Sequence, residues 1–346
     1  MTIRPLLGAT LLAVTQTVSG DRGSFTPLGT PDLLPTDMSA DGSRIVGRHS
    51  GSFGPNFLWT AEGGIVTLGG GCPSGRVVIS GDGERIAGCA VTEGGLWEAA
   101  EWIGGENWRA LSRLPSQLPC DHYLSGPRGF DHDGSHLAGM SWGPPTCFHH
   151  AVVWGLPGGT MTDLGPGDIV GVSGDGRVLV GSVFQGRQLA ARWVDGTPTL
   201  ITADDGGDLG EAAAVNRDGS VIVGVGYSKK SGAAWRWKDG EGVIAIGQGR
   251  DYRTFDDDWD SWALDVSDEG SVVVGLTLSN DRGWVWRERG GFEWFDDFLA
   301  RQKIDGAAGW KVRRVDAVSA DGTIFAGWGT NPIGKLEGFV VSTRPR

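Results

Sequence analysis

The sequence predicts an all-β protein, a seven-bladed β-propeller with four-stranded blades whose ring is closed by a strand from the N-terminus. Three observations support this prediction. A turn motif occurs seven times, an apolar run with an aromatic residue follows each copy, and the last copy lacks a final strand that the N-terminus can supply. A repeat period of roughly 46 residues is typical of propeller blades. Since no linker divides the chain, residues 21–346 are expected to form one domain.

The repeated motif is an apolar residue, a small polar residue, any residue, an acid, glycine, two variable residues, two mostly apolar residues and a second glycine. The small polar residue can hydrogen-bond the backbone two residues ahead, and the first glycine can adopt a positive φ. Each copy therefore predicts a β-hairpin, with strand a, a tight turn and strand b. The second glycine would either end strand b or let a neighbouring backbone approach closely. The copies span 38–47, 79–88, 130–139, 172–181, 215–224, 266–275 and 318–327.

Two further strands are expected in each unit. Strand c contains an aromatic residue, and these are Trp59, Trp102, Trp154, Trp193, Trp237, Trp286 and Phe339. Strand d is marked by Leu68, Leu111, Leu164, Leu200, Ile246 and Phe295. The seventh unit has no strand d before the chain stops, so the segment FTPLG at 25–29 is expected to complete it. This closure would remove an exposed sheet edge.

The N-terminus predicts export. Arg4, the apolar run Leu6–Val14 and small residues near Gly20 are typical of a secretory signal peptide over residues 1–20, and a disordered or strand-forming N-terminus is the alternative. We therefore expect a secreted monomer, periplasmic or extracellular. No run of about eighteen apolar residues predicts a transmembrane segment. The net charge of −12 disfavours nucleic-acid binding.

The four cysteines are consistent with an exported protein, because export permits disulfides. Cys120 and Cys147 flank the third hairpin almost symmetrically, and Cys72 and Cys89 flank the second. These positions predict the disulfides Cys120–Cys147 and Cys72–Cys89. The spacing does not match a zinc site.

The motif, the following A-x-x-W strand and the Leu-Gly ending together form a recognisable set. The stretch His150-Ala151-Val152-Val153-Trp154 is one clear copy of strand c. The set resembles the bacterial extracellular HAF-repeat family over nearly the whole chain after residue 20. This resemblance implies export and a β-propeller-like fold, and implies no particular activity. The turns also resemble the Asp-boxes of sialidase-type propellers, but the final tryptophan of those boxes is absent, so we interpret the similarity as convergent turn chemistry.

The expected binding surface is the face that carries the b–c and d–a loops. These loops vary in length, whereas the a–b turns are short and uniform. Aromatic side chains on that face would suit a glycan or protein ligand, and packing between blades is the alternative. The candidate ligand-binding residues are Trp97, His122, Tyr123, Trp142, Trp259, Trp262, Trp310 and Trp328.

An acidic loop lies before the sixth unit. Asp256, Asp257, Asp258 and Asp260 could hold Ca²⁺, which favours several oxygen ligands. Their spacing matches no recognised calcium loop, and a solvated acidic loop is the alternative. No cofactor is required by any other feature of the sequence.

The sequence contains no P-loop or HExxH motif, so we assign no catalytic residue. We therefore expect a non-catalytic binding module for an extracellular glycan, protein or cell-surface ligand. The alternative is a polysaccharide-active enzyme, a lyase or hydrolase, in which His122 and Tyr123 abstract and return a proton. Incidental loop residues are the simpler interpretation of that pair.

Overall fold

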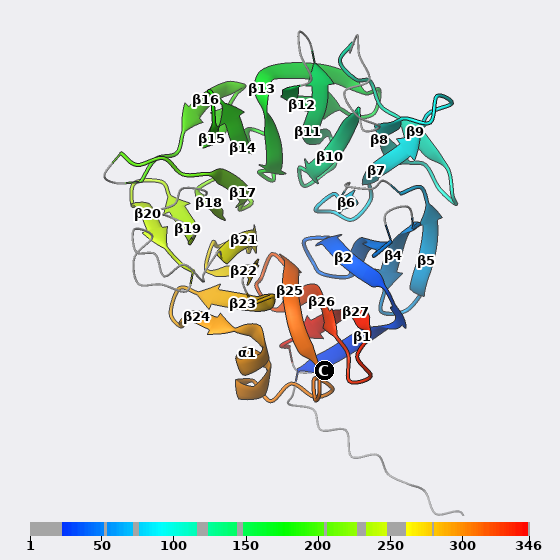
Figure 1. Ribbon diagram of the computed structural model, residues 1–346, viewed down its shortest axis with the longest axis vertical. Helices are drawn as coiled ribbons and strands as arrows, with labels where there is room; N and C mark the ends of the chain where they lie inside the picture. The colour runs from blue at the N-terminus through cyan, green and yellow to red at the C-terminus, as the bar shows by residue number, and fades with distance from the viewer. Residues whose placement is uncertain are drawn as a thin grey trace, which may run out of the picture.

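The computed structural model describes residues 23–51, 54–71, 76–115, 124–143, 148–203, 206–226, 233–247, 261–278 and 280–344. These residues form six antiparallel sheets, five with four strands and one with seven. Figure 1 shows the sheets arranged around a central axis, with β2, β6, β10, β17, β21 and β25 nearest to it. The fold is therefore all-β apart from one short helix, as the sequence predicts.

The sheets follow one another along the chain. The first contains β2 (Leu33–Met38), β3 (Arg44–His49), β4 (Asn56–Thr60) and β5 (Gly64–Gly69). The second contains β6 (Val78–Ile79), β7 (Ile86–Val91), β8 (Trp97–Trp102) and β9 (Trp108–Ala110). The seven-stranded sheet contains β10 (Ser125–Phe130), β11 (His136–Gly143), β12 (Phe148–Gly155), β13 (Thr160–Val172), β14 (Val178–Phe184), β15 (Gln188–Val194) and β16 (Thr197–Leu200).

The remaining three sheets have four strands each. One contains β17 (Glu211–Val215), β18 (Val221–Val225), β19 (Ala234–Lys238) and β20 (Gly242–Ala245). The next contains β21 (Ser261–Val266), β22 (Val272–Thr277), β23 (Arg282–Arg287) and β24 (Gly291–Trp294). The last has the order β1-β27-β26-β25, from β1 (Ser24–Pro31), β25 (Lys311–Val318), β26 (Ile324–Thr330) and β27 (Leu336–Ser342). The first and last strands of the chain are thus antiparallel neighbours.

Six sheets arise from seven repeats because β13 is shared. Its first part pairs with β12 from Thr160 to Pro166, and its second part pairs with β14 from Gly167 to Val172. Strand d of the third repeat and strand a of the fourth are therefore one continuous strand. The sequence analysis expected a loop between them.

The expected strand c aromatics all lie in strands, and Trp154 and Trp193 are fully buried. Of the strand d markers, Leu68, Leu164 and Leu200 lie in strands, whereas Leu111 and Ile246 lie one residue after β9 and β20. The sixth marker is wrong. Phe295 does not lie in a strand but begins the helix α1 (Phe295–Arg301), while β24 ends one residue earlier at Trp294. The helix buries Phe295 against Phe325 and Phe339, which explains why this aromatic residue is apolar core without belonging to the sheet. No helix in the described part of the chain is long and apolar enough to cross a membrane.

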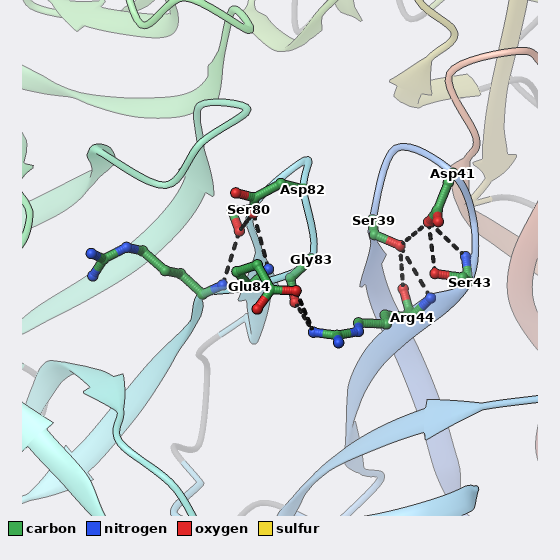
Figure 2. Close-up of polar contacts among 9 residues, drawn as sticks. Ser39, Asp41, Ser43, Arg44, Ser80, Asp82, Gly83 and Glu84 are labelled. Carbon is green, nitrogen blue, oxygen red and sulfur yellow. Dashed lines mark hydrogen bonds and ion pairs between the residues drawn. The ribbon is translucent and has the colours of Figure 1, made fainter. Parts of the chain in front are cut away.

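The seven turns share one hydrogen-bond pattern, which Figure 2 shows for the first two copies. The small polar residue accepts from a backbone N–H five residues ahead, not two as predicted. In the first copy the N–H of Arg44 donates to Ser39 Oγ at 3.1 Å. The bond two residues ahead is instead made by the acid, since the N–H of Ser43 donates to Asp41 Oδ1 at 2.9 Å. The seven acceptors of the longer bond are Ser39, Ser80, Asp131, Ser173, Asn216, Ser267 and Ser319.

Consecutive turns are also joined to one another. Backbone hydrogen bonds run from Ala40 to Gly81, from His132 to Gly174, from Gly174 to Arg217 and from Asp268 to Ala320. The N–H of Ala320, in the last copy, donates to the carbonyl of Ala40, in the first, at 2.8 Å. The turns therefore contact one another in sequence order, and the last turn contacts the first.

In six of the seven copies the second glycine lets strand a approach closely, which is one of its two predicted roles, and in every copy it lies inside strand b and does not end it. A Cβ at Gly275 would lie 1.9 Å from the carbonyl oxygen of Trp262, and one at Gly181 would lie 2.0 Å from that of Asp168. Strand a has a β-bulge just after this contact, at residues such as Arg128 and Leu264. A bulge inserts one extra residue and redirects its side chain.

Candidate functional site

A pocket of about 530 Å³, here called the channel pocket, lies around the central axis. It is lined by the beginnings of strands a and c and by the ends of strands b, which all point to the face of the b–c and d–a loops. This is the face on which the sequence predicts a binding site. Six of the seven repeats contribute residues, so the pocket belongs to the whole ring of sheets and not to one of them.

The wall of the channel pocket is aromatic. Trp142 ends β11 and packs edge-on against His149 of β12, with ring centroids 4.2 Å apart. Phe148 and Phe184 contact each other at 5.4 Å and are 48% and 44% exposed. Trp262 of β21 adds a second indole from another sheet. Exposed aromatic rings of this kind present flat apolar faces to a ligand.

The other lining residues include three arginines and two carboxylates. Arg128 on β10 forms an ion pair with Asp168 on β13 at 3.5 Å. The Arg76 guanidinium donates to the carbonyl of Thr36 at 3.1 Å. Arg314 on β25 donates to Asp316 Oδ1 at 2.5 Å. The lining thus combines apolar faces with fixed charges of both signs.

The bulges of the a strands bring side chains such as that of Arg128 to the wall of the channel pocket. Arg128, Val170, Ala213 and Leu264 are the extra residues of four bulged a strands, and all four line the channel pocket. The same four residues and Arg76 also line a smaller cavity of about 160 Å³ on the side of the a–b turns. The two cavities therefore meet in the middle of the ring, where one residue from each bulge faces the axis.

Five carboxylates line the smaller cavity: Asp37, Asp131, Asp265, Asp268 and Asp316. Burial raises the pKa of Asp37 to about 6, and the nearby Arg76 opposes this shift. Burial likewise raises the pKa of Asp265 to about 7. Asp265 accepts from the N–H groups of Val266 and Val318, both at 2.8 Å, and so joins β21 to β25.

Several buried polar atoms of the channel pocket have no hydrogen-bond partner within the described part of the chain. They are Nε of Arg76, Nε1 of Trp142 and Oδ1 of Asp168. A buried donor or acceptor without a partner costs about 1–3 kcal/mol. Atoms of this kind are therefore expected to bind water or a ligand.

His149 is the titratable base of the described lining. Burial lowers the pKa of His149, although the nearby Asp168 opposes the shift. The imidazole is therefore mainly neutral at pH 7, and its two ring nitrogens can donate one hydrogen bond and accept one.

The structure brings together some of the predicted residues and separates others. Trp142 and Trp262 line the channel pocket. Trp97 lies behind Trp142, in a cluster with Cys89 and Met140. Trp310 packs on Phe25 with ring centroids 4.9 Å apart, and so belongs to the core around β1. Trp328 on β26 is not among the residues that line the pocket.

The other predicted residues lie outside the described part of the chain: His122, Tyr123, Trp259, Asp256, Asp257, Asp258, Asp260, Cys72, Cys120 and Cys147. The calcium site, the disulfides and the His122–Tyr123 pair therefore stay predictions. Cys89 is 1% exposed on β7, where the Cys72–Cys89 prediction places one partner. Within the described ranges, no group of three His, Cys, Asp or Glu side chains is arranged to hold a metal ion.

Sequence reasoning missed the charged lining. Arg128 and Asp316 occupy the position two residues before the motif, where other repeats carry Val170, Ala213 or Leu264. In these two repeats a charged residue stands where Val170, Ala213 and Leu264 are apolar, and this difference was the available signal for a charged lining. Only the structure shows that the bulges turn these two positions towards the central axis.

No family profile and no curated protein matches this sequence. Two solved structures share a remote likeness. A structure described as TolB from Agrobacterium tumefaciens has a TM-score of 0.46 and 15% identity, over 93% of this chain and 98% of that one. TolB from Acinetobacter baumannii has a TM-score of 0.47 and 13% identity, over 89% of this chain and 79% of that one. Nothing about function follows from likenesses this remote.

Proposed function

We propose that this chain is an exported, monomeric seven-bladed β-propeller that binds a ligand in the channel pocket without catalysing a reaction. The observation that carries the proposal is the combination of exposed aromatic rings with buried polar atoms that have no partner among the described residues, both in one pocket. Ligand sites are concave, mostly apolar and equipped with a few polar groups that fix orientation. The channel pocket has each of these properties.

The seven-bladed ring is part of the proposal. Two facts support it. The shared strand β13 accounts for one sheet fewer than the number of repeats. The pairing of β1 with β27 and the hydrogen bond from Ala320 to Ala40 are contacts that a closed ring requires. Under this proposal the N-terminal strand is the fourth strand of the seventh blade.

Export is proposed from the signal-peptide pattern of residues 1–20, and membership of the HAF-repeat family from the motif and strand c. A periplasmic or extracellular location would place the pocket where glycans and proteins of the cell surface are available. The acidic loop at 256–260 would add Ca²⁺ dependence if its carboxylates bind the ion.

The experiment is binding of the mature, oxidised protein to glycan and peptide arrays, with Ca²⁺ and with EDTA. We expect saturable binding that is lost in Trp262→Ala, because this side chain lines the pocket. The matched control is Arg177→Gln, which removes only an exposed ion pair with Asp195. Binding that Trp262→Ala leaves unchanged would contradict the proposed site, and absence of binding to either array would contradict the proposed function.

A further inference from the structure

We infer that the ligand of the channel pocket is a protein, which covers the pocket and also packs an uncharged, apolar part of its surface on the b–c loops around it. This inference rests on the proposed function and names the class of partner. It follows from where the exposed apolar side chains lie, from how a loop holds them and from the charges beside them.

Large exposed apolar side chains gather at the b–c ends of the sheets. The described residues include ten such side chains, and five of them stand at the end of a strand b, in a b–c loop or at the start of a strand c. These five are between 44% and 78% exposed, and we call them the apolar tips: Val91, Phe148, Phe184, Leu278 and Ile333. The a–b turns, on the opposite face, carry none of the ten.

The apolar tips extend beyond the channel pocket. They belong to the second, third, fourth, sixth and seventh repeats, whose strands stand around the central axis in Figure 1. Phe148 and Phe184 line the pocket, but the other three tips are not among its lining residues. A ligand confined to the pocket would therefore leave three tips in water. A specific protein interface buries about 800 Å² on each partner, which requires side chains from several loops.

The chemistry of the tips favours a protein over a glycan. Val91, Leu278 and Ile333 are aliphatic and have none of the flat aromatic faces on which sugar rings stack. Burial of an aliphatic side chain against another apolar surface is favourable in proportion to the area removed from water. The centre of a protein interface is apolar and poor in charged residues, so it offers such a surface.

The loop of the most exposed tip is held in place. Asn331 Oδ1 accepts from the N–H of Ile333 at 3.1 Å, and the Asn331 amide donates to Glu337 Oε2 at 2.7 Å. Glu337 Oε1 in turn accepts from the N–H of Gly29 at 2.8 Å, so this hairpin is tied to β1. A partner therefore does not have to order the hairpin, which lowers the entropic cost of binding.

The charges beside the tips are balanced. The five b–c loops span 92–96, 144–147, 185–187, 278–281 and 331–335, and they carry two acids, Glu93 and Asp281, and two bases, Arg187 and Lys335. Asp281 accepts from Arg313 at 2.5 Å, and Arg187 forms an ion pair with Asp208. Loops without net charge are complementary to an uncharged surface. An anionic lipid surface would instead require clustered Lys or Arg side chains.

The test uses phage-displayed random peptides of about twelve residues, which span roughly 40 Å when extended. They are selected on the mature, oxidised protein in EDTA and then measured as synthetic peptides by isothermal titration calorimetry. We expect the selected sequences to be rich in apolar residues and poor in charged ones. Added NaCl should change their affinity little, because the loops carry no net charge for salt to screen.

Variants locate the contact. Ile333→Asn and Leu278→Asn should each weaken binding about tenfold, because each replaces an exposed apolar contact by a polar side chain. Ile103→Asn is the matched control, since Ile103 is 57% exposed but lies in a c–d turn on the opposite face. The urea midpoint is recorded for each variant. Hydrogen exchange of the wild-type protein, which should slow at 278–281 and 331–335 when peptide binds, gives the same test without any substitution.

Three results would overturn the inference while leaving the proposed function intact. The first is binding that Trp262→Ala abolishes but Ile333→Asn and Leu278→Asn leave unchanged, because that ligand is confined to the pocket. The second is binding of glycans on the arrays with no peptide selected. The third is self-association in analytical ultracentrifugation, or binding to phosphatidylcholine vesicles, that Ile333→Asn abolishes while no peptide binds. Failure of every ligand on the arrays to bind would instead remove the proposed function itself.

Discussion

At the scale of single residues, the motif positions differ in what constrains them. The acid of the turn is held by local hydrogen bonds. The N–H of Arg177 and the hydroxyl of Ser173 lower the pKa of Asp175, so this carboxylate is ionised and structural. In every copy but the second, the second glycine is constrained by a neighbouring strand, since any side chain would meet the carbonyl oxygen of strand a.

Gly275→Ala tests that constraint. Its Cβ would lie 1.9 Å from the carbonyl oxygen of Trp262, so we expect the free energy of unfolding to fall by about 3 kcal/mol. Gly155→Ala is the matched control, because its Cβ would have nothing nearer than Thr160 O at 3.9 Å. Urea unfolding of both variants measures the difference, and equal losses would contradict the close approach.

At the scale of elements, strand a contributes both to the hydrogen bonds between neighbouring sheets and to the lining of the channel pocket. Its bulge places one residue per blade at the axis, and Asp37 and Asp265 use the adjacent position to reach the next inner strand. Asp37 Oδ2 accepts from Ile79 N–H at 3.0 Å, and Asp265 Oδ2 accepts from Val318 N–H at 2.8 Å. These two carboxylates therefore link neighbouring blades at equivalent places in the repeat.

The raised pKa of Asp265 predicts a pH-dependent contribution to stability. Because this pKa is about 7 in the folded state and lower when unfolded, the folded state keeps a proton that the unfolded state loses between pH 4 and 7. The stabilisation is complete below about pH 4 and is lost as the pH rises through 7. The advantage of wild type over Asp265→Asn should therefore shrink by about 4 kcal/mol from pH 4 to pH 8, since the shift is about three pKa units.

Urea unfolding at unit steps of pH measures this difference. The charges of Asp37 and Arg76 also affect the pKa of Asp265. The control for general charge effects is Asp195→Asn, because Asp195 forms an exposed ion pair with Arg177. A gap between wild type and Asp265→Asn that stays constant over the whole pH range would show that Asp265 does not titrate as described.

Much of the element pattern could be predicted because it depends on local chemistry. The two glycines of the motif lie five residues apart in every copy, an aromatic residue follows each turn, and short-range rules interpret these residues directly. Phe295 was assigned wrongly because a buried aromatic residue looks the same in a strand and on the apolar face of a helix. The continuity of β13 escaped prediction because a tight junction of two strands resembles a loop when it contains Pro166 and Gly167.

At the scale of the whole molecule, the account requires that the chain ends meet in one blade. β1 pairs with β27, and Phe25 of β1 packs on Phe339 at 4.8 Å. The aromatic pocket residues Trp142 and Trp262 could be proposed from sequence, because loops of a repeat fold share one face. The charged lining could not, because it depends on bulges and on distances between blades that no local pattern fixes.

Removing β1 tests the closure. A variant that lacks residues 1–31 should unfold at a midpoint several degrees below one that lacks residues 1–22, because the edge of β27 and the face of Phe339 become exposed. A synthetic peptide of residues 24–31 added in excess should restore much of the loss by binding to β27. Equal midpoints for the two variants would contradict closure by β1.

The central claim is that the channel pocket binds the ligand, and a crystal structure of the protein with a ligand selected on the glycan and peptide arrays tests it most directly. We predict that the ligand packs on Trp142 and Trp262, inside the channel pocket. A ligand bound on the face of the a–b turns or on the outer strands, with the channel pocket empty, would contradict the claim.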